Sequence, residues 1–173
     1  MNTAELRRFF IVVAPFAFLL SGAVLIAGFV LGDTEPSIAP GIGSDHWHAR
    51  YAFVVCDEAQ PNAPFWEAGV HTHGDGIIHI HPFTAAEEGR GARLVKWFEY
   101  GGGVLKEDEV RLPGDDVTYR NGDECQDGSE GLLQVFVTPA ATGVEEELED
   151  WSEYIPQDGD RIIIEFADRR ETY

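Results

Sequence analysis

The chain has few basic residues, and this deficit limits the partners it can bind. Its 173 residues include 12 lysines and arginines against 31 aspartates and glutamates, a formal net charge of −19. Such a surface repels nucleic acid and anionic lipid headgroups and attracts cations at long range. We therefore expect no nucleic-acid partner. The same charge also favours solubility in an external or salty medium.

Cysteine is scarce as well. Cys56 and Cys125 are the only two, and neither belongs to a CxxC pair, so a thiolate metal site has little support. An even cysteine count is typical of disulfides in an oxidising compartment. We expect a disulfide between Cys56 and Cys125, with a thiolate ligand for Cu(I) or zinc as the alternative.

Charge is absent from one long stretch near the N-terminus. Residues 9–31 form an uncharged, apolar run, and about 20 such residues span a bilayer as a helix. The run is followed by neither an A-x-A cleavage pattern nor a lipobox cysteine. Arg7 and Arg8 precede it, which orients residues 1–8 to the cytoplasm. The sequence therefore predicts an uncleaved single-pass transmembrane helix over 9–31 that carries the rest of the chain outside the cell membrane.

The remainder of the chain divides into a linker and one domain. Residues 32–44 are rich in proline, glycine and serine, as linkers are. Residues 45–173 are long enough to bury a core of their own. They show no long internal repeat and no low-complexity tract.

The hydrophobic pattern of this domain predicts an α+β fold. Residues 46–56 alternate, with aromatic side chains on one side, as in a strand that faces a core. Thr84-Ala85-Ala86-Glu87 is a capping box that predicts a helix start, and residues 93–100 continue with helical spacing. We expect a mainly antiparallel β domain with one or two short helices, after the transmembrane helix.

All six histidines fall into His-x-His pairs. A spacing of two on a strand places both rings on one face, and imidazole is the commonest ligand of borderline transition metals. Three such pairs in one domain predict a metal site, with zinc or copper as the ion. The predicted ligands are His46, His48, His71, His73, His79 and His81.

Two of the pairs are joined by a tight turn. Residues 69–83 read as a β-hairpin closed by a three-residue loop, Gly74-Asp75-Gly76. This register pairs His71 with His79 and points all four rings the same way, whereas a two-residue turn would split them. Asp75 is a further ligand candidate, and Asp45 and Asp75 are candidates for orienting the rings.

Other interpretations of the histidines remain open. They include structural strand histidines, and proton sensing below about pH 6.5. HTHGDG is similar to the copper-binding strand of copper–zinc superoxide dismutases, but the bridging histidine and downstream spacing are absent. A cupin-type site would need a glutamate such as Glu87 or Glu88, at a spacing that departs from the pattern. Ser-His-Asp and Cys-His arrangements are not evident, so we favour metal binding over catalysis.

Two segments resemble known families. DHWHARYAFVVCDE followed by GVHTHGDGIIHIHPF resembles a family of bacterial single-pass membrane proteins without an established activity, which implies architecture and location for residues 45–103. Residues 132–167, which end in YIPQDGDRIIIEF, look like the last part of a β-grasp domain. That likeness implies a β-grasp-like arrangement at the C-terminal end, without the terminal Gly-Gly of sulfur carriers.

The sequence thus predicts a membrane-tethered, extracytoplasmic metal-binding protein for metal capture, delivery or sensing. Two alternatives remain. One is a histidine-ligated metalloenzyme with oxidative or hydrolytic activity. The other is a metal-stabilised interaction module of a membrane complex, whose membrane-protein partner the sequence does not identify.

Overall fold

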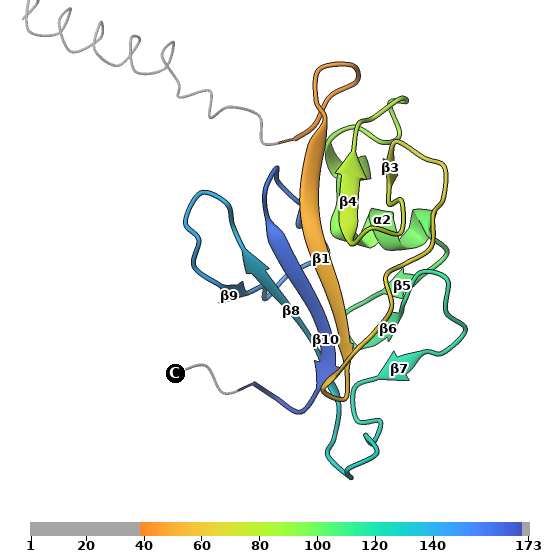
Figure 1. Cartoon of the computed structure of the whole chain (residues 1–173), viewed down its shortest axis with the longest axis vertical. Helices are drawn as coiled ribbons and strands as arrows, with labels where there is room; N and C mark the ends of the chain where they lie inside the picture. Colours follow the sequence, from red (N-terminus) through yellow and green to blue (C-terminus); the bar gives the residue numbers. More distant parts are fainter. Residues whose placement is uncertain (1–38, 171–173) are drawn as a thin grey trace, which may run out of the picture. The chain divides into compact units, whose positions relative to one another are not determined.

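Two long parallel strands lie at the centre of the fold (Figure 1). The computed structural model describes residues 39–170, and in it β1 (Trp47–Val55) pairs in parallel with β10 (Arg161–Ala167). β8 (Leu132–Thr138) pairs antiparallel with the other side of β10. All three strands are rich in β-branched and aromatic residues, which favour a pleated, half-buried surface.

Shorter strands extend this sheet on both sides. The order across it is β3-β4-β1-β10-β8-β9, and β2 pairs with the last residues of β1. The shorter members are β2 (Glu58–Ala59), β3 (Val70–His71), β4 (Ile77–Ile80) and β9 (Glu146–Glu147).

The described residues also form a second, smaller sheet and two short helical elements. The smaller sheet consists of β5 (Val104–Leu105), β6 (Glu109–Arg111) and β7 (Tyr119–Arg120). The helical elements are the 3-10 helix η1 (Gly89–Ala92) and the α-helix α2 (Leu94–Tyr100).

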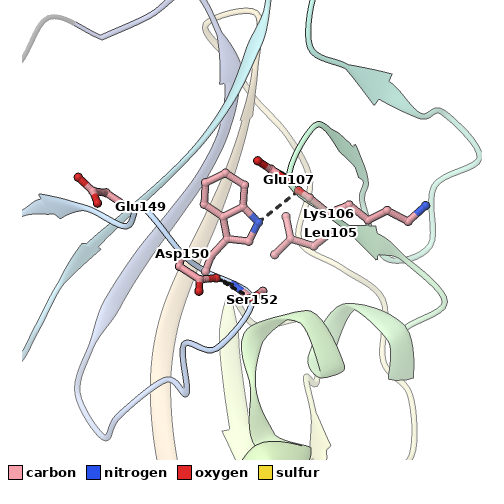
Figure 2. Close-up of a pocket in the computed structure, with 7 residues that line it drawn as sticks. Leu105, Lys106, Glu107, Glu149, Asp150 and Ser152 are labelled. Carbon is pink, nitrogen blue, oxygen red and sulfur yellow. Dashed lines mark hydrogen bonds between the residues drawn. The ribbon is translucent and has the colours of Figure 1, made fainter.

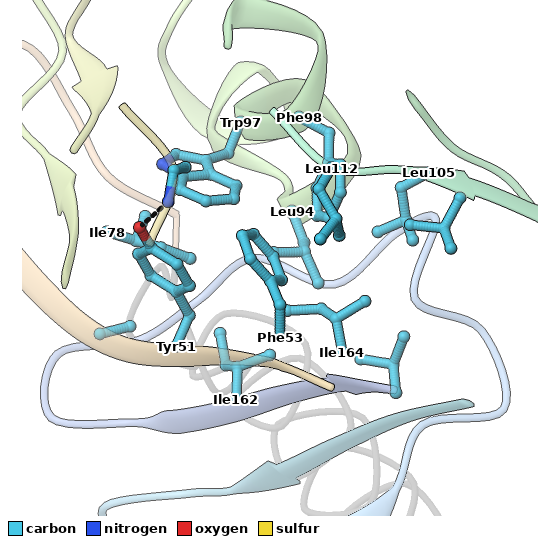
Figure 3. Close-up of a cluster of buried hydrophobic side chains, with 14 of the residues drawn as sticks. Tyr51, Phe53, Ile78, Leu94, Trp97, Phe98, Leu105, Leu112, Ile162 and Ile164 are labelled. Carbon is cyan, nitrogen blue, oxygen red and sulfur yellow. Dashed lines mark hydrogen bonds between the residues drawn. The ribbon is translucent and has the colours of Figure 1, made fainter. Parts of the chain in front are cut away.

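The core lies between one face of the large sheet and α2 (Figure 3). Tyr51 and Phe53 point from β1 toward Trp97 and Phe98 of the helix. The ring centres of Tyr51 and Trp97 are 4.8 Å apart, and those of Phe53 and Phe98 are 5.9 Å apart. These four side chains are at most 7 % exposed. The prediction that the aromatic side of residues 46–56 faces the core is confirmed.

The predicted fold class is wrong. We expected an α+β fold with an N-terminal transmembrane helix, but residues 39–170 are mostly β with a single seven-residue α-helix. Within these residues no helix combines the length and apolar character that a membrane crossing requires. The predicted segment 9–31 lies outside the described residues, so the structure gives a transmembrane helix no support.

The helix expected to start at Thr84 is also absent. The Glu87 carboxylate accepts hydrogen bonds from the backbone N–H groups of Phe83 and Thr84, as a capping box would, but it also accepts one from Gly69 at 2.7 Å. Residues 84–87 therefore form a turn that ties β3 to the end of β4. Helical structure begins only at Gly89, the first residue of η1, whose φ of +50° separates it from the turn.

A disulfide joins Cys56 to Cys125, as the sequence predicts. It attaches the end of β1 to the loop after β7, across a sequence separation of 69 residues. Closing a loop of this length restricts the unfolded chain and stabilises a fold by roughly 2–4 kcal/mol.

Reduction of this disulfide is expected to destabilise the domain. The Cys56→Ser/Cys125→Ser variant should lose roughly 2–4 kcal/mol of unfolding free energy, measured by urea denaturation. A reductant should lower the stability of the wild type by a similar amount and leave the double variant unchanged. A wild type indifferent to reductant would contradict the stabilising role of the bond.

Candidate metal centre

The strand register places the histidines on the face of the sheet opposite the core. β4 pairs with β1 so that His79 is opposite His48, and with β3 so that His79 is opposite His71. Ile78 and Ile80, which alternate with His79, are fully buried on the core side. The predicted pairing of His71 with His79 is confirmed, and a row of three histidines crosses three neighbouring strands.

The six imidazoles form a closed ring, which we call the histidine ring. Each side chain has a neighbour on both sides, and consecutive ring centres are 4.6 to 4.9 Å apart. The sequence predicted four converging rings from the hairpin, and the β1–β4 pairing adds the remaining two. The order around the ring is His46, His48, His79, His73, His71, His81 and back to His46.

Three members of the histidine ring lie close enough together to hold one metal ion. One ligand atom each of His46, His48 and His79 lies within 4.8 Å of the others. His46 and His48 are exposed, and His79 is half-buried. Three imidazoles with a solvent-facing side can hold zinc or copper and leave a coordination position open.

The other side of the histidine ring contains a closer pair. The Nε2 atoms of His71 and His73 are 3.1 Å apart. His71 is only 4 % exposed, whereas His73 is exposed and stacks on Phe65 with ring centres 5.7 Å apart. His71 is the last residue of β3, and His73 lies in the loop between β3 and β4.

Tryptophan side chains hold β3 from the core side. The Trp66 indole donates to the carbonyl oxygen of Val70 at 3.0 Å, and the Trp97 indole donates to that of His71 at 3.1 Å. A buried indole N–H needs an acceptor, and here the acceptors are backbone groups of the histidine-bearing strand. From the sequence, Trp97 was only one of the residues 93–100 expected to be helical, and Trp66 carried no prediction. The only signal in the sequence for these contacts was the general need of an indole N–H for a hydrogen-bond acceptor.

The two aspartates proposed to orient histidines behave differently. Asp75 Oδ2 lies 3.1 Å from Nε2 of His79, while its Oδ1 accepts from Thr72 and from the backbone of Ile77. Asp75 thus occupies one nitrogen of the His79 ring and leaves the other for a metal. Asp45 instead accepts hydrogen bonds from Gly41 and Ser44 within its own turn.

A carboxylate that the sequence analysis missed positions the start of β1. Asp158 Oδ1 accepts a hydrogen bond from the backbone N–H of His48 at 2.8 Å, and Gly159 donates to the His48 carbonyl oxygen. Asp158 lies far from His48 in the sequence, so no local pattern pointed to it. Its charge also opposes the lowering of the His48 pKa.

Glu87 is not a ligand of this site. Its carboxylate is used by the backbone of residues 69, 83 and 84, as described above. Burial opposes its ionisation, but these hydrogen bonds outweigh it and hold the pKa of Glu87 below the usual range. Glu88 accepts a hydrogen bond from the backbone of Ile42. The cupin-type arrangement is therefore not formed.

Burial and mutual repulsion keep several imidazoles neutral. Desolvation, followed by the neighbouring His81, His73 and His79, lowers the pKa of His71 to about 4. Desolvation and neighbouring histidines also lower the pKa of His48 and of His81. The neutral form is the one that binds metal ions.

Comparison of the chain with family models, curated proteins and solved structures finds no match. The functional assignment therefore depends on the geometry of the histidine ring. The likeness to single-pass membrane proteins and the β-grasp-like ending stay predictions.

The metal-free protein should lose stability as the pH falls. The folded pKa of His71 is about 4, below its ordinary value, so the unfolded chain binds a proton more readily between about pH 6.5 and 4. Stability from this group is complete above pH 6.5. It declines by at most about 1.4 kcal/mol per pH unit on acidification. Urea denaturation of wild type and His71→Asn at pH 7.5, 6 and 5 should show a shallower pH slope in the variant, and equal slopes would contradict the assignment.

Removing the acceptor of His79 should weaken metal binding. In Asp75→Asn the side-chain oxygen can still accept from the backbone of Ile77, but the amide cannot replace the carboxylate opposite His79. We expect zinc affinity, measured by competition with a chromophoric chelator, to fall about 10- to 100-fold. Asp45→Asn is the matched control and should bind zinc as the wild type does. Equal affinities for the two variants would exclude an orienting role for Asp75.

Proposed function

We propose that this protein binds zinc or copper through its histidine ring and serves metal capture, delivery or sensing outside the cytoplasm. The observation that carries the proposal is the convergence of His46, His48 and His79, with ligand atoms within 4.8 Å of one another. His48 of β1, His79 of β4 and His46, the residue before β1, meet there without any rearrangement of the backbone pairing.

The donor chemistry supports zinc or copper. Every ligand candidate in the histidine ring is an imidazole nitrogen, which suits zinc and copper better than the hard, oxygen-preferring cations. Both cysteines are used in the disulfide, so thiolate ligation within this chain is not available.

The openness of the site favours metal exchange over catalysis. His46 and His48 are exposed at the start of β1. Three cavities of about 340 to 450 Å³ lie elsewhere: beside Leu105 and Asp150 (Figure 2), beside the disulfide, and beside Arg50 and Arg161. Catalytic sites usually lie in concave pockets. A histidine lines none of these three cavities, so none of them brings the histidine ring into a pocket of that kind.

Charge and redox state support the proposed setting. A formal charge of −19 raises the local concentration of cations at the surface. The Cys56–Cys125 disulfide is typical of proteins in an oxidising compartment, which supports an extracytoplasmic location.

The test is metal binding by the purified full chain. We expect zinc and copper to bind stoichiometrically, by elemental analysis after dialysis, and zinc at 100 times its Kd to add about 2.7 kcal/mol of unfolding free energy. The His46→Ala/His48→Ala/His79→Ala variant should bind at least one equivalent fewer.

Arg50→Ala is the matched control, because Arg50 lies on the same strand and face as His48 and is exposed. It should retain the full metal content. A wild-type chain that carries neither metal after loading, and whose stability neither metal changes, would refute the proposed function.

A further inference from the structure

We propose that the histidine ring is a two-metal centre. In this arrangement His46, His48 and His79 hold one ion, and His71, His73 and His81 hold a second ion. The inference rests on the proposed function and adds a site, because the close triad of His46, His48 and His79 includes no member of the second group.

The distance between His71 and His73 is the first support. Two nitrogen ligands of a tetrahedral zinc ion, each bonded at about 2.0–2.1 Å, are separated by roughly 3.3 Å. The two Nε2 atoms are 3.1 Å apart, which is close to the separation of two ligands of one ion. In the metal-free protein one Nε2–H donates to the other nitrogen. A metal ion would take both lone pairs, with the donor's proton moved to Nδ1.

His81 supplies the third ligand. Its ring centre is 4.7 Å from that of His71, at an interplanar angle of 83°. Imidazoles bound to one tetrahedral metal have ring centres roughly 5 Å apart, so this spacing suits a shared ion. The His71–His73 distance between ring centres is also 4.7 Å.

Two phenylalanines distinguish the second position from the first. Phe65 stacks on His73, and Phe83 lies edge-on to His81 with ring centres 4.7 Å apart. Both phenylalanines are exposed, at 59 % and 64 %, and each has its ring against a histidine. Together with the buried His71 they make this side of the histidine ring less polar than the His46–His48 side.

The charges near the histidine ring suit two cations. His79 lies between the two groups, with its ring centre 4.8 Å from His48 and 4.6 Å from His73. The Asp75 carboxylate contacts His79, and the Asp158 carboxylate contacts the backbone of His48. Both carboxylates lie beside histidines of the first group, and their charge would offset part of the repulsion between two bound cations.

The experiment counts metal ions in paired variants of the full chain. Zinc titration with elemental analysis should give two equivalents for the wild type, one for His46→Ala/His48→Ala and one for His71→Ala/His73→Ala. Because His71 is buried, the single variant His73→Ala, at an exposed position, repeats the second test with less risk to folding. Circular dichroism establishes that each variant is folded.

Copper(II) gives a second measurement. With both positions filled, dipolar coupling between the two ions should broaden the electron paramagnetic resonance spectrum and produce a half-field signal. Both features should be absent in His73→Ala.

The possible outcomes are distinguishable. One equivalent in the wild type, unaffected by His73→Ala, would overturn the two-metal centre and leave the proposed function intact. Loss of all binding in both folded pair variants would mean one shared site and would also overturn it. No binding by the wild type would overturn the proposed function itself.

Discussion

The antiparallel register of β4 against β1 and β3 is the constraint on which the rest of the site depends. Side chains alternate along a strand, so a slip of one residue would turn His79 toward the core and Ile78 and Ile80 toward solvent. Ile78 and Ile80 are fully buried, and this burial opposes such a slip. The same register sets His79 between His48 and His71, so the packing of the core and the geometry of the histidine ring have one cause.

The core also supports the site through polar groups. The indoles of Trp66 and Trp97 donate to the carbonyl oxygens of β3, a strand of only two residues. A strand this short makes few hydrogen bonds to its neighbouring strand, so side-chain donors help to hold it in place. Glu87 does the same for the backbone at the start of β3 and the end of β4. The backbone that carries the imidazoles is therefore held by the indoles on the core side of the sheet and by Glu87 beside the start of β3 and the end of β4.

Local patterns predicted much of the site and less of the fold. His-x-His spacing, the Gly74-Asp75-Gly76 loop and the aromatic alternation of residues 46–56 correctly indicated the pairing of His71 with His79 and the core face. The helix at Thr84 was predicted wrongly, because the capping glutamate binds Gly69, a partner that no local pattern reveals. The α+β class was wrong for the same kind of reason: helical signals were overruled by long-range contacts, and one short helix remains.

The sequence by itself determined which side chains share a face, because strand periodicity is a property of neighbouring residues. It also determined that two cysteines allow only one intramolecular disulfide. The tertiary structure alone decided that β1 lies beside β4, which closes six imidazoles into one ring. It also decided that Asp75 rather than Asp45 contacts a histidine, and that Phe65 and Phe83 cover one side. These features depend on which distant segments pack together, and that choice is made by the burial of the whole core and not by any single segment.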